Sequence, residues 1–230
     1  MAAEDDALNG DIGRRADVHG AQLAWRPSPS PTVTRKRLHR TGGAEDGQVT
    51  SIVRYAPGAS FPAHDHPEGE EILVLEGTFS DEHGDWPAGT FLANPEGFRH
   101  APFSREGCVL FVKLRQLAGP GRQHVALQTG DMRWEPTGTP GVAAKPLLAD
   151  AAFPDQTRLE RWDAGTDRGP RHYPRGAEFF VWKGSFEDEA GRHAAHAWLR
   201  LPPGGAHHAR SPEGCIVYVK TGAVAALRCG

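Results

Sequence analysis

The chain has 230 residues and a formal net charge of −3, so it is long enough for one large domain or for two of about 100 residues each. This charge gives no electrostatic reason to expect nucleic acid or an anionic membrane as a partner. Glycine (28 residues) and proline (19 residues) are abundant, as in proteins built from short strands and many turns. No apolar run approaches the roughly 20 residues that span a bilayer. We therefore expect an all-β protein with no membrane or nucleic-acid partner.

The segment before Trp25 is small, charged and without periodicity. We predict a mobile N-terminal tail over residues 1–24, with a packed first strand as the alternative. The first residues lack the basic and apolar segments of a signal peptide. The three cysteines of the chain are an odd number without a CxxC pair, which argues against a disulfide framework: Cys108, Cys215 and Cys229. Together these features predict a cytoplasmic protein.

Candidate metal ligands are concentrated in the stretch PAHDHPEGEEILVLEG, which begins at Pro62. His64 and His66 are two positions apart in a segment without helical period, so both face the same side of a strand. A Pro-Glu-Gly turn then returns Glu70 toward the same pocket, and His100 is a fourth candidate. Imidazole and carboxylate donors suit Fe²⁺ or Zn²⁺, and also Mn²⁺, Ni²⁺ or Cu²⁺, better than Ca²⁺ or Mg²⁺. We predict one divalent transition metal here; the alternative for any single histidine is a solvated side chain.

The chain is an internal duplication. WRPSPSPTVTRKRL, from Trp25, recurs as WEPTGTPGVAAKPL, from Trp134, at an offset of 109. From Val49 to Lys113 the offset is 107 without a gap, so that EILVLEGTFSDEHG matches EFFVWKGSFEDEAG and SREGCVLFVK matches SPEGCIVYVK. We predict one domain over 25–115, a linker over 116–133, a second domain over 134–222 and a C-terminal tail over 223–230.

Short apolar runs bounded by turn residues predict the strands of each copy. Ile72–Leu75 and Val109–Leu114 are two such runs, and Glu82–Asp85 is a turn. Ile72–Leu75 is apolar on both faces, so both faces need to be covered. We expect the two copies to pack on each other, or a second subunit to cover one face in a homodimer.

The second copy has lost most of the candidate ligands. Only His100 keeps its type, as His207, whereas Glu71 survives as Glu178. Residues kept in both copies serve the shared fold and residues lost together serve the metal, so we predict Glu70 rather than Glu71 as the ligand. We expect the second copy to be mainly structural. The alternative is an anion-binding pocket made of Arg171, Tyr173 and His207; the first two replace His64 and His66, and Ala177 replaces Glu70.

The stretch GASFPAHDHPEGEEILVLEG resembles the first motif of the cupin superfamily, and PAGTFLANPEGFRH resembles the second. Within this superfamily, the run from EEILVLEG to SREGC is most similar to the cupin domain of the ChrR-type anti-sigma factors. The resemblance covers Trp25–Leu114, with Trp134–Lys220 as a degenerate copy. It implies two tandem jelly-roll barrels, a bicupin, with the family's metal ligands on His64, His66, Glu70 and His100.

ChrR-type regulators also carry an N-terminal zinc-binding domain with a His-x3-Cys-x2-Cys signature, and the segment before Trp25 contains no cysteine. We therefore do not expect a sigma factor as partner, and expect a stand-alone bicupin with a small-molecule ligand or substrate. Candidates for an apolar pocket, or for core packing, are Phe61, Trp86, Phe98 and Phe103.

Three functions fit these residues. The first is an Fe(II)-dependent dioxygenase that acts on a small enolisable substrate, like the diketone- and flavonol-cleaving cupins. The second is a non-catalytic zinc-binding cupin that senses or binds a ligand. The third is a structural oligomer stabilised by its metal. No nucleophile–base pair is legible, so hydrolase chemistry has no support and no catalytic residue is assigned. We favour the first function and keep the second as the alternative.

Overall fold

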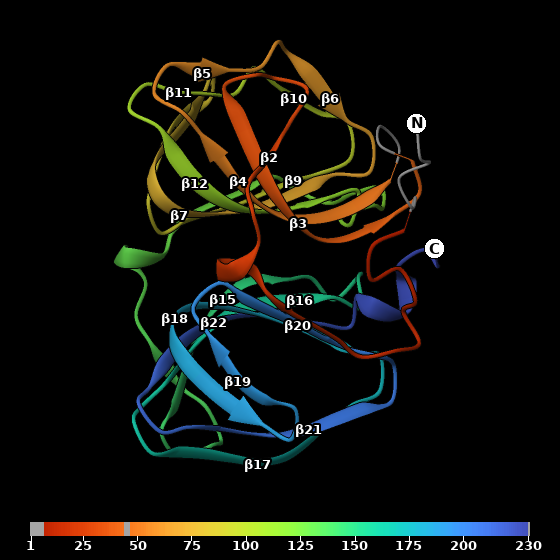
Figure 1. Ribbon diagram of the computed structural model, residues 1–230, viewed down its shortest axis with the longest axis vertical. Coiled ribbons are helices and arrows are strands. Elements are labelled where there is room, and N and C mark those ends of the chain that lie inside the picture. Colours follow the sequence, from red (N-terminus) through yellow and green to blue (C-terminus); the bar gives the residue numbers. More distant parts are fainter. Residues whose placement is uncertain (1–6, 44–46, 230) are drawn as a thin grey trace. The chain divides into compact units, whose positions relative to one another are not determined.

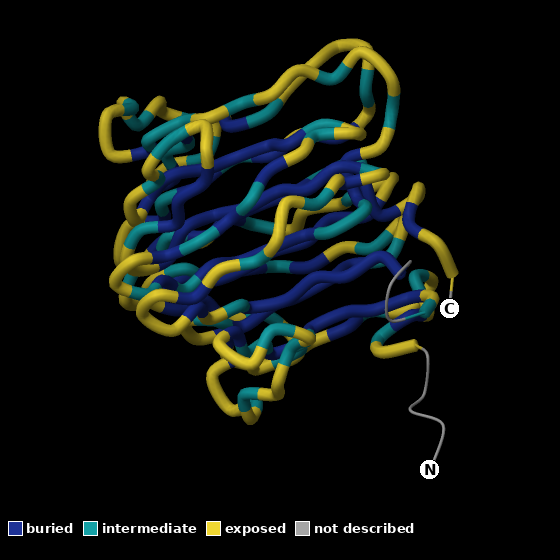
Figure 2. The backbone as a smooth tube through the Cα atoms, turned by 90° about the horizontal axis from the view of Figure 1, so that it is seen from above, coloured by how far each residue is buried: buried dark blue, intermediate teal, exposed yellow. Residues whose placement is uncertain are grey.

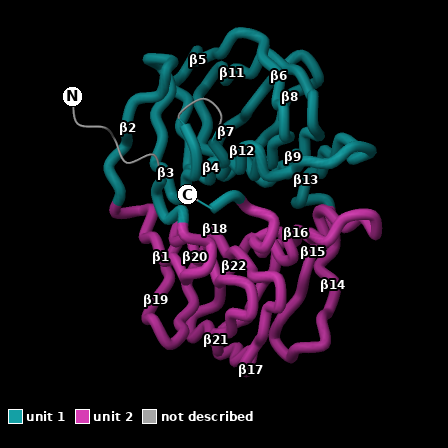
Figure 3. The backbone as a smooth tube through the Cα atoms, turned by 90° about the vertical axis from the view of Figure 1, so that its right-hand side faces the viewer, with its two compact units in different colours: residues 1–10, 23–131, 228–230 teal, residues 11–22, 132–227 magenta. Residues whose placement is uncertain are grey.

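The structure is a computed structural model that describes residues 7–43 and 47–229. The chain forms two compact units, shown in Figure 3. Unit 1 comprises residues 1–10, 23–131 and 228–230, and unit 2 comprises residues 11–22 and 132–227. Apart from three short 3-10 helices, the regular elements of the described residues are β-strands (Figure 1), which confirms the all-β prediction. None of the helices in the described part of the chain is long and apolar enough to cross a membrane.

Unit 1 contains one large antiparallel sheet and a smaller group of short strands. The order in the large sheet is β13 (Val125–Gln128), β9 (Thr90–Asn94), β7 (Glu70–Asp81), β12 (Cys108–Leu114), β4 (Gln48–Tyr55), β3 (Val33–Thr41) and β2 (Arg26–Pro27). The short strands are β5 (Ala59–Ser60), β8 (Gly84–Pro87), β11 (Phe103–Ser104) and the separate pair β6 (His64–His66) and β10 (Phe98–His100). Apolar residues of both groups form one buried core.

Strand β7 belongs to both groups of strands because it bends at a bulge. Its first half pairs with β9 and β12, its second half pairs with β8, and the register with β12 shifts between Val109 and Leu110. Gly77 adopts φ 70° at the bend, and a Cβ on it would lie 2.2 Å from the backbone oxygen of Gly107. Only glycine fits there, which explains why the second copy also has glycine, Gly184, at this position.

Unit 2 repeats this plan. Its large sheet has the order β1 (Ala16–His19), β20 (Ala197–Leu201), β18 (Ala177–Asp188), β22 (Cys215–Thr221), β16 (Gln156–Trp162), β15 (Val142–Ala149) and β14 (Glu135–Pro136). The shorter group contains β17 (Thr166–Tyr173), β19 (Gly191–Ala194) and β21 (Gly205–Ser211). In Figure 2 the buried residues follow the strands and the exposed residues gather in the turns.

Each sheet is completed by a strand from outside its own predicted domain. Strand β1 pairs with β20 in unit 2, and β13 pairs with β9 in unit 1. The two strands occupy corresponding places in the duplication, since Ala16 and Val125 differ by the same offset of 109 as the first repeat segment. The N-terminal segment thus serves the sheet of the second copy, and the segment between the copies serves the sheet of the first.

Regular elements extend into all three segments that were predicted as tails or as a linker. Within 1–24, the described part contains β1 and the 3-10 helix Gly20–Gln22, so the alternative of a packed first strand is the correct one; residues 1–6 lie outside the described residues. The predicted linker, 116–133, contains β13 and the 3-10 helix Thr129–Asp131. The predicted C-terminal tail contains the 3-10 helix Val224–Ala226. Edge strands need only one buried face, so their sequences carry little apolar pattern.

Candidate metal centre

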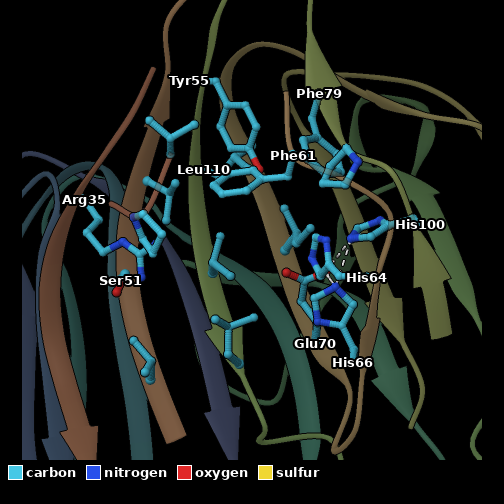
Figure 4. Close-up of a pocket in the computed structure, with 18 of the residues that line it drawn as sticks. Arg35, Ser51, Tyr55, Phe61, His64, His66, Glu70, Phe79, His100 and Leu110 are labelled. Atoms are coloured by element: carbon cyan, nitrogen blue, oxygen red, sulfur yellow. Dashed lines mark hydrogen bonds and ion pairs between the residues drawn. The ribbon is translucent and has the colours of Figure 1, made fainter. Parts of the chain in front are cut away.

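Three of the four predicted ligands converge inside unit 1. His64 and His66 lie on β6, and His100 lies opposite His64 on the antiparallel neighbour β10. Alternation along β6 turns both of its histidines to one face, and the pairing brings His100 to the same place. The possible donor atoms of the three residues lie within 4.8 Å of one another. The Nε2 atoms of His66 and His100 are 2.9 Å apart. Figure 4 shows the three histidines gathered beside Glu70.

Glu70 stands next to these histidines at the start of β7. Its Oε2 lies 3.5 Å from Nε2 of His66 and 3.8 Å from Nε2 of His100. The side-chain amide of Asn94, on the adjacent strand β9, donates to the same oxygen at 3.0 Å. Asn94 therefore fixes the carboxylate in an orientation toward the imidazoles. Glu71 is also buried, but the alternation of β7 turns its side chain to the other face.

A buried aspartate orients His100. Nδ1 of His100 donates to Oδ2 of Asp81 at 3.1 Å, and the other oxygen of Asp81 accepts from the backbone N–H of His83 and from Nε1 of Trp86. Similarly, Nδ1 of His64 donates to the carbonyl of Pro62 at 2.9 Å. Both contacts place the proton on Nδ1 and leave the Nε2 lone pair for a metal ion.

The second copy keeps Asp81 as Asp188, so the comparison of the copies alone places it among the residues of the shared fold. The structure shows that Asp188 holds Nδ1 of His207 at 3.1 Å, in the same way that Asp81 holds His100. The signal in the sequence was the joint survival of an aspartate and a histidine nineteen positions apart in both copies. That signal marks a hydrogen-bonded pair and not only a fold position.

The surroundings shift the pKa values of His66 and His100 in opposite directions. Burial lowers the pKa of His66, which favours the neutral, metal-binding form. Burial also acts to lower the pKa of His100, but the hydrogen bond to Asp81 and the charge of Glu70 raise it above its usual value. Burial acts to raise the pKa of Asp81, and the hydrogen bonds from His100, His83 and Trp86 hold it below its usual value. Asp81 is therefore ionised, and protons compete with a metal mainly at His100.

The arrangement fits a divalent transition metal. With its proton on Nδ1, His100 directs the lone pair of Nε2 at Nε2 of His66, only 2.9 Å away, and the carboxylate of Glu70 faces both. A cation among these atoms would satisfy lone pairs that otherwise face one another. Imidazole nitrogens with one carboxylate suit Zn²⁺, Fe²⁺, Mn²⁺ or Ni²⁺, and do not select among them by type alone.

The three histidines border a cavity of about 510 Å³, within the range of ligand pockets. Its walls are mostly apolar and come from both groups of strands in unit 1. Among the predicted aromatic candidates, Phe61 lines the cavity, whereas Trp86, Phe98 and Phe103 are not among its lining residues. Apolar side chains that line it include Val33, Val53, Ile72, Phe79, Leu110 and Val112.

Aromatic side chains occupy the corresponding place in unit 2. Tyr173 packs against Phe179 and against His207, with ring centroids 5.6 and 5.8 Å apart. Arg171 is exposed and donates to Thr139 and to the backbone of Arg168, while His207 is buried. Tyr173 and His207 are therefore in contact, while the guanidinium of Arg171 is bound by Thr139 and the backbone of Arg168. The anion site formed by these three residues stays a prediction. Within residues 7–43 and 47–229, only His64, His66 and His100 form a group that could hold a metal.

Solved structures show the same fold at low sequence identity, and the likeness therefore concerns the fold alone. A putative dioxygenase from Nostoc punctiforme has a TM-score of 0.75 at 15% identity, over 93% of this chain and 84% of that chain. Salicylate 1,2-dioxygenase from Pseudoaminobacter salicylatoxidans has a TM-score of 0.67 at 12% identity, over 93% and 82%. A bacterial pirin from Escherichia coli, in complex with nickel(II), has a TM-score of 0.68 at 14% identity, over 90% and 98%.

No curated protein sequence matches the chain. The sequence profile of the ChrR cupin-like domain, however, matches twice, over residues 14–118 and 122–225. Each match includes the strand that completes the sheet of the other copy, β1 in the first and β13 in the second. The two matches confirm the predicted cupin duplication. The chain therefore belongs to the ChrR cupin-like domain family and is a bicupin.

Proposed function

We propose that this bicupin is a mononuclear metal enzyme, an Fe(II)-dependent dioxygenase that acts on a small enolisable substrate. The observation that carries the proposal is the convergence of three imidazoles and one carboxylate on a mostly apolar cavity large enough for a small molecule. A metal that only stabilised the fold would need no such cavity beside it. The similar fold of a putative dioxygenase and of salicylate 1,2-dioxygenase is consistent with this reading.

In this proposal His64, His66, Glu70 and His100 hold the ion. Asp81 fixes the ring of His100, and Asn94 fixes the carboxylate of Glu70. Fe(II), when bound, supplies the redox-active electrophile, and four protein ligands leave positions open for small molecules. The apolar walls exclude water from the substrate and strengthen the electrostatic interactions of the polar groups that remain.

The second candidate is a zinc-binding cupin that senses or binds a ligand without turnover. Membership of the ChrR cupin-like family favours it, because the family is named for a regulator. The donor set itself does not decide, since the same ligands bind zinc and iron. Zinc has no second accessible oxidation state and therefore cannot support oxygenase chemistry.

Oxygen consumption distinguishes the two candidates. Protein purified without chelator is loaded with Fe(II) under anaerobic conditions and assayed with an oxygen electrode against a panel of diketones, flavonols and related enols. We expect uptake with at least one compound, no uptake by the Zn(II) form with the same compound, and loss of uptake in His100→Ala. Flat traces for the Fe(II) form across the panel, together with tight zinc binding, would favour the sensor.

A further inference from the structure

The cavity of unit 1 has a second polar region on the wall formed by β3 and β4, away from the metal ligands. Arg35 comes from β3, and Ser51 and Tyr55 come from β4. Figure 4 shows Arg35 and Ser51 on one side of the cavity and the histidines on the other. The predicted metal ligands come from other strands, so the metal site does not account for this polar region.

Ser51 is the first sign that this region receives a ligand. Its side chain lines the cavity and is 3% exposed, yet its Oγ has no hydrogen-bond partner in the described structure. A buried hydroxyl without a partner costs folding free energy, so such groups are rare unless a ligand or water completes them. The hydroxyl is thus placed to bind something that enters the cavity.

The second copy provides an independent comparison. Arg35 lies opposite Val53 in unit 1, and its counterpart Ala144 lies opposite Glu160 in unit 2, at the matching place in the register. Ser51 and Tyr55 are replaced by Arg158 and Trp162, which make internal contacts with Glu160. None of Arg35, Ser51 and Tyr55 is kept in the copy that also lost three of the four metal ligands; that copy places Arg158, Glu160 and Trp162, bonded to one another, on this wall. Residues lost together with the ligands belong to the function of the cavity and not to the fold.

We propose that Arg35 and Ser51 bind the carboxylate of a small organic acid whose body is apolar and whose other end carries a hydroxyl or carbonyl oxygen directed at the metal. A guanidinium matches the planar geometry of a carboxylate and offers paired N–H donors. One guanidinium and one hydroxyl suit a singly charged group better than a phosphate. The apolar walls between the two polar ends accommodate the body of the molecule.

Tyr55 lies between these two ends. Burial and the charge of Glu70 raise its pKa, whereas the charge of Arg35 acts to lower it. The phenol therefore stays neutral and keeps its proton as a hydrogen-bond donor toward a bound anion. The inference rests on the proposed metal site, because the metal receives the second end of the ligand.

Binding by the full-length Zn(II) protein tests this assignment without turnover. The probes are 4-hydroxybenzoate and 4-oxopentanoate, each compared with its carboxamide by isothermal titration calorimetry. We expect at least one acid to bind about tenfold or more tightly than its amide, as a charge-assisted hydrogen bond predicts. In Arg35→Gln the preference disappears because only the acid loses affinity, and in Arg35→Lys part of it remains.

Arg54→Gln is the matched control. Arg54 lies on β4 next to residues that line the cavity. Its own side chain is exposed, and its guanidinium lies 4.3 Å from the ring centroid of Trp25. Its substitution should leave both affinities unchanged. Thermal melting and zinc content verify that each variant is folded, and if Arg35→Gln fails this check, Arg35→Lys carries the comparison. Equal affinities for acid and amide in the wild-type protein, no binding of either acid, or a preference that persists in Arg35→Gln would overturn the assignment.

The outcome is separable from that of the oxygen assay. If the Fe(II) protein consumes no oxygen but the Arg35-dependent preference is present, the dioxygenase proposal fails and the carboxylate site stands. If a neutral diketone is oxidised and no acid is preferred, the carboxylate site fails and the dioxygenase stands.

Discussion

At the candidate metal centre, two adjacent glutamates have different surroundings because a strand turns successive side chains to opposite faces. Glu70 directs Oε2 at the Nε2 atoms of His66 and His100, at 3.5 and 3.8 Å. Glu71 is equally buried but belongs to the other face, and its counterpart Glu178 persists in the copy without a metal site. The assignment of Glu70 as a ligand stays a prediction.

Substitution of the two glutamates checks this division. Glu70→Gln should lower the affinity for Zn(II) or Fe(II) by at least about tenfold, because a charged donor is replaced by a weak neutral one. Glu71→Gln should keep the metal and lower the free energy of unfolding by about 1–3 kcal/mol. Chelator competition measures the first and urea denaturation the second. Loss of metal in Glu71→Gln, with normal binding in Glu70→Gln, would reverse the assignment.

The histidine positions were predictable from the sequence, whereas their hydrogen-bond partners were not. The spacing of His64 and His66 and the strand pattern around them are local, and the repeat separated Glu70 from Glu71. Asp81 and Asn94 act on the site from β7 and β9, and their roles depend on pairings that become visible only in the folded sheets. Arg35 and Ser51 were missed for the same reason, since no metal-ligand motif contains them.

At the scale of elements, the corresponding aspartates on β7 and β18 hold different partners and therefore have different roles. Asp81 orients His100, one of the candidate metal ligands of unit 1. Asp188 accepts hydrogen bonds from His207, from His193 and from Arg15, which lies next to β1. Its side chain is fully buried, so the cluster ties the N-terminal segment to the rest of unit 2. The packed segment could not be deduced from its own sequence, because its partner β20 lies about 180 residues further along the chain.

Asparagine at the two positions should therefore have different effects. Asp81→Asn should reduce metal affinity about 10-fold or more, because the ring of His100 loses its charged partner. Asp188→Asn should leave the metal content unchanged and lower the free energy of unfolding by about 3 kcal/mol, since Arg15 loses a buried counter-ion. Elemental analysis and urea denaturation measure the two effects. A loss of metal in Asp188→Asn would contradict the separation of the two roles.

The Asp188 cluster also predicts an acid dependence. Burial acts to raise the pKa of Asp188, but the hydrogen bonds from His193, His207 and Arg15 hold it well below the ordinary value of 3.8. The unfolded chain therefore takes up this proton first, and the stability contributed by the carboxylate is present above about pH 3.8 and lost as the pH falls below it. Denaturation between pH 5 and 2.5 should show a steeper loss in the wild type than in Asp188→Asn. Parallel curves would contradict this contribution.

At the scale of the whole chain, duplication preserved the backbone positions of the metal site while its side chains changed. His64 pairs with His100 across β6 and β10, and Arg171 pairs with His207 across β17 and β21 in the same register. His207 keeps its aspartate, and its Nε2 is buried without a hydrogen-bond partner in the described structure. Unit 2 thus retains His207 as one oriented nitrogen donor, and it retains the backbone register of the positions that correspond to the other candidate ligands. The all-β class and the duplication were predictable because strand patterns and repeats are properties of the sequence itself.

This preserved register predicts that the second site can be restored. The wild type should bind about one transition metal per chain, and the triple variant Arg171→His/Tyr173→His/Ala177→Glu should bind about two, since it returns the three missing donors to the positions that correspond to His64, His66 and Glu70. Elemental analysis after loading with Zn(II) measures the content. The same variant with His207→Ala is the control, and its content should return to one. A content of two in the wild type would contradict the account of unit 2. A content of one in the triple variant would contradict the prediction. It would indicate that the buried side chains of Trp162 and Phe179 prevent metal binding even when the four ligands are present.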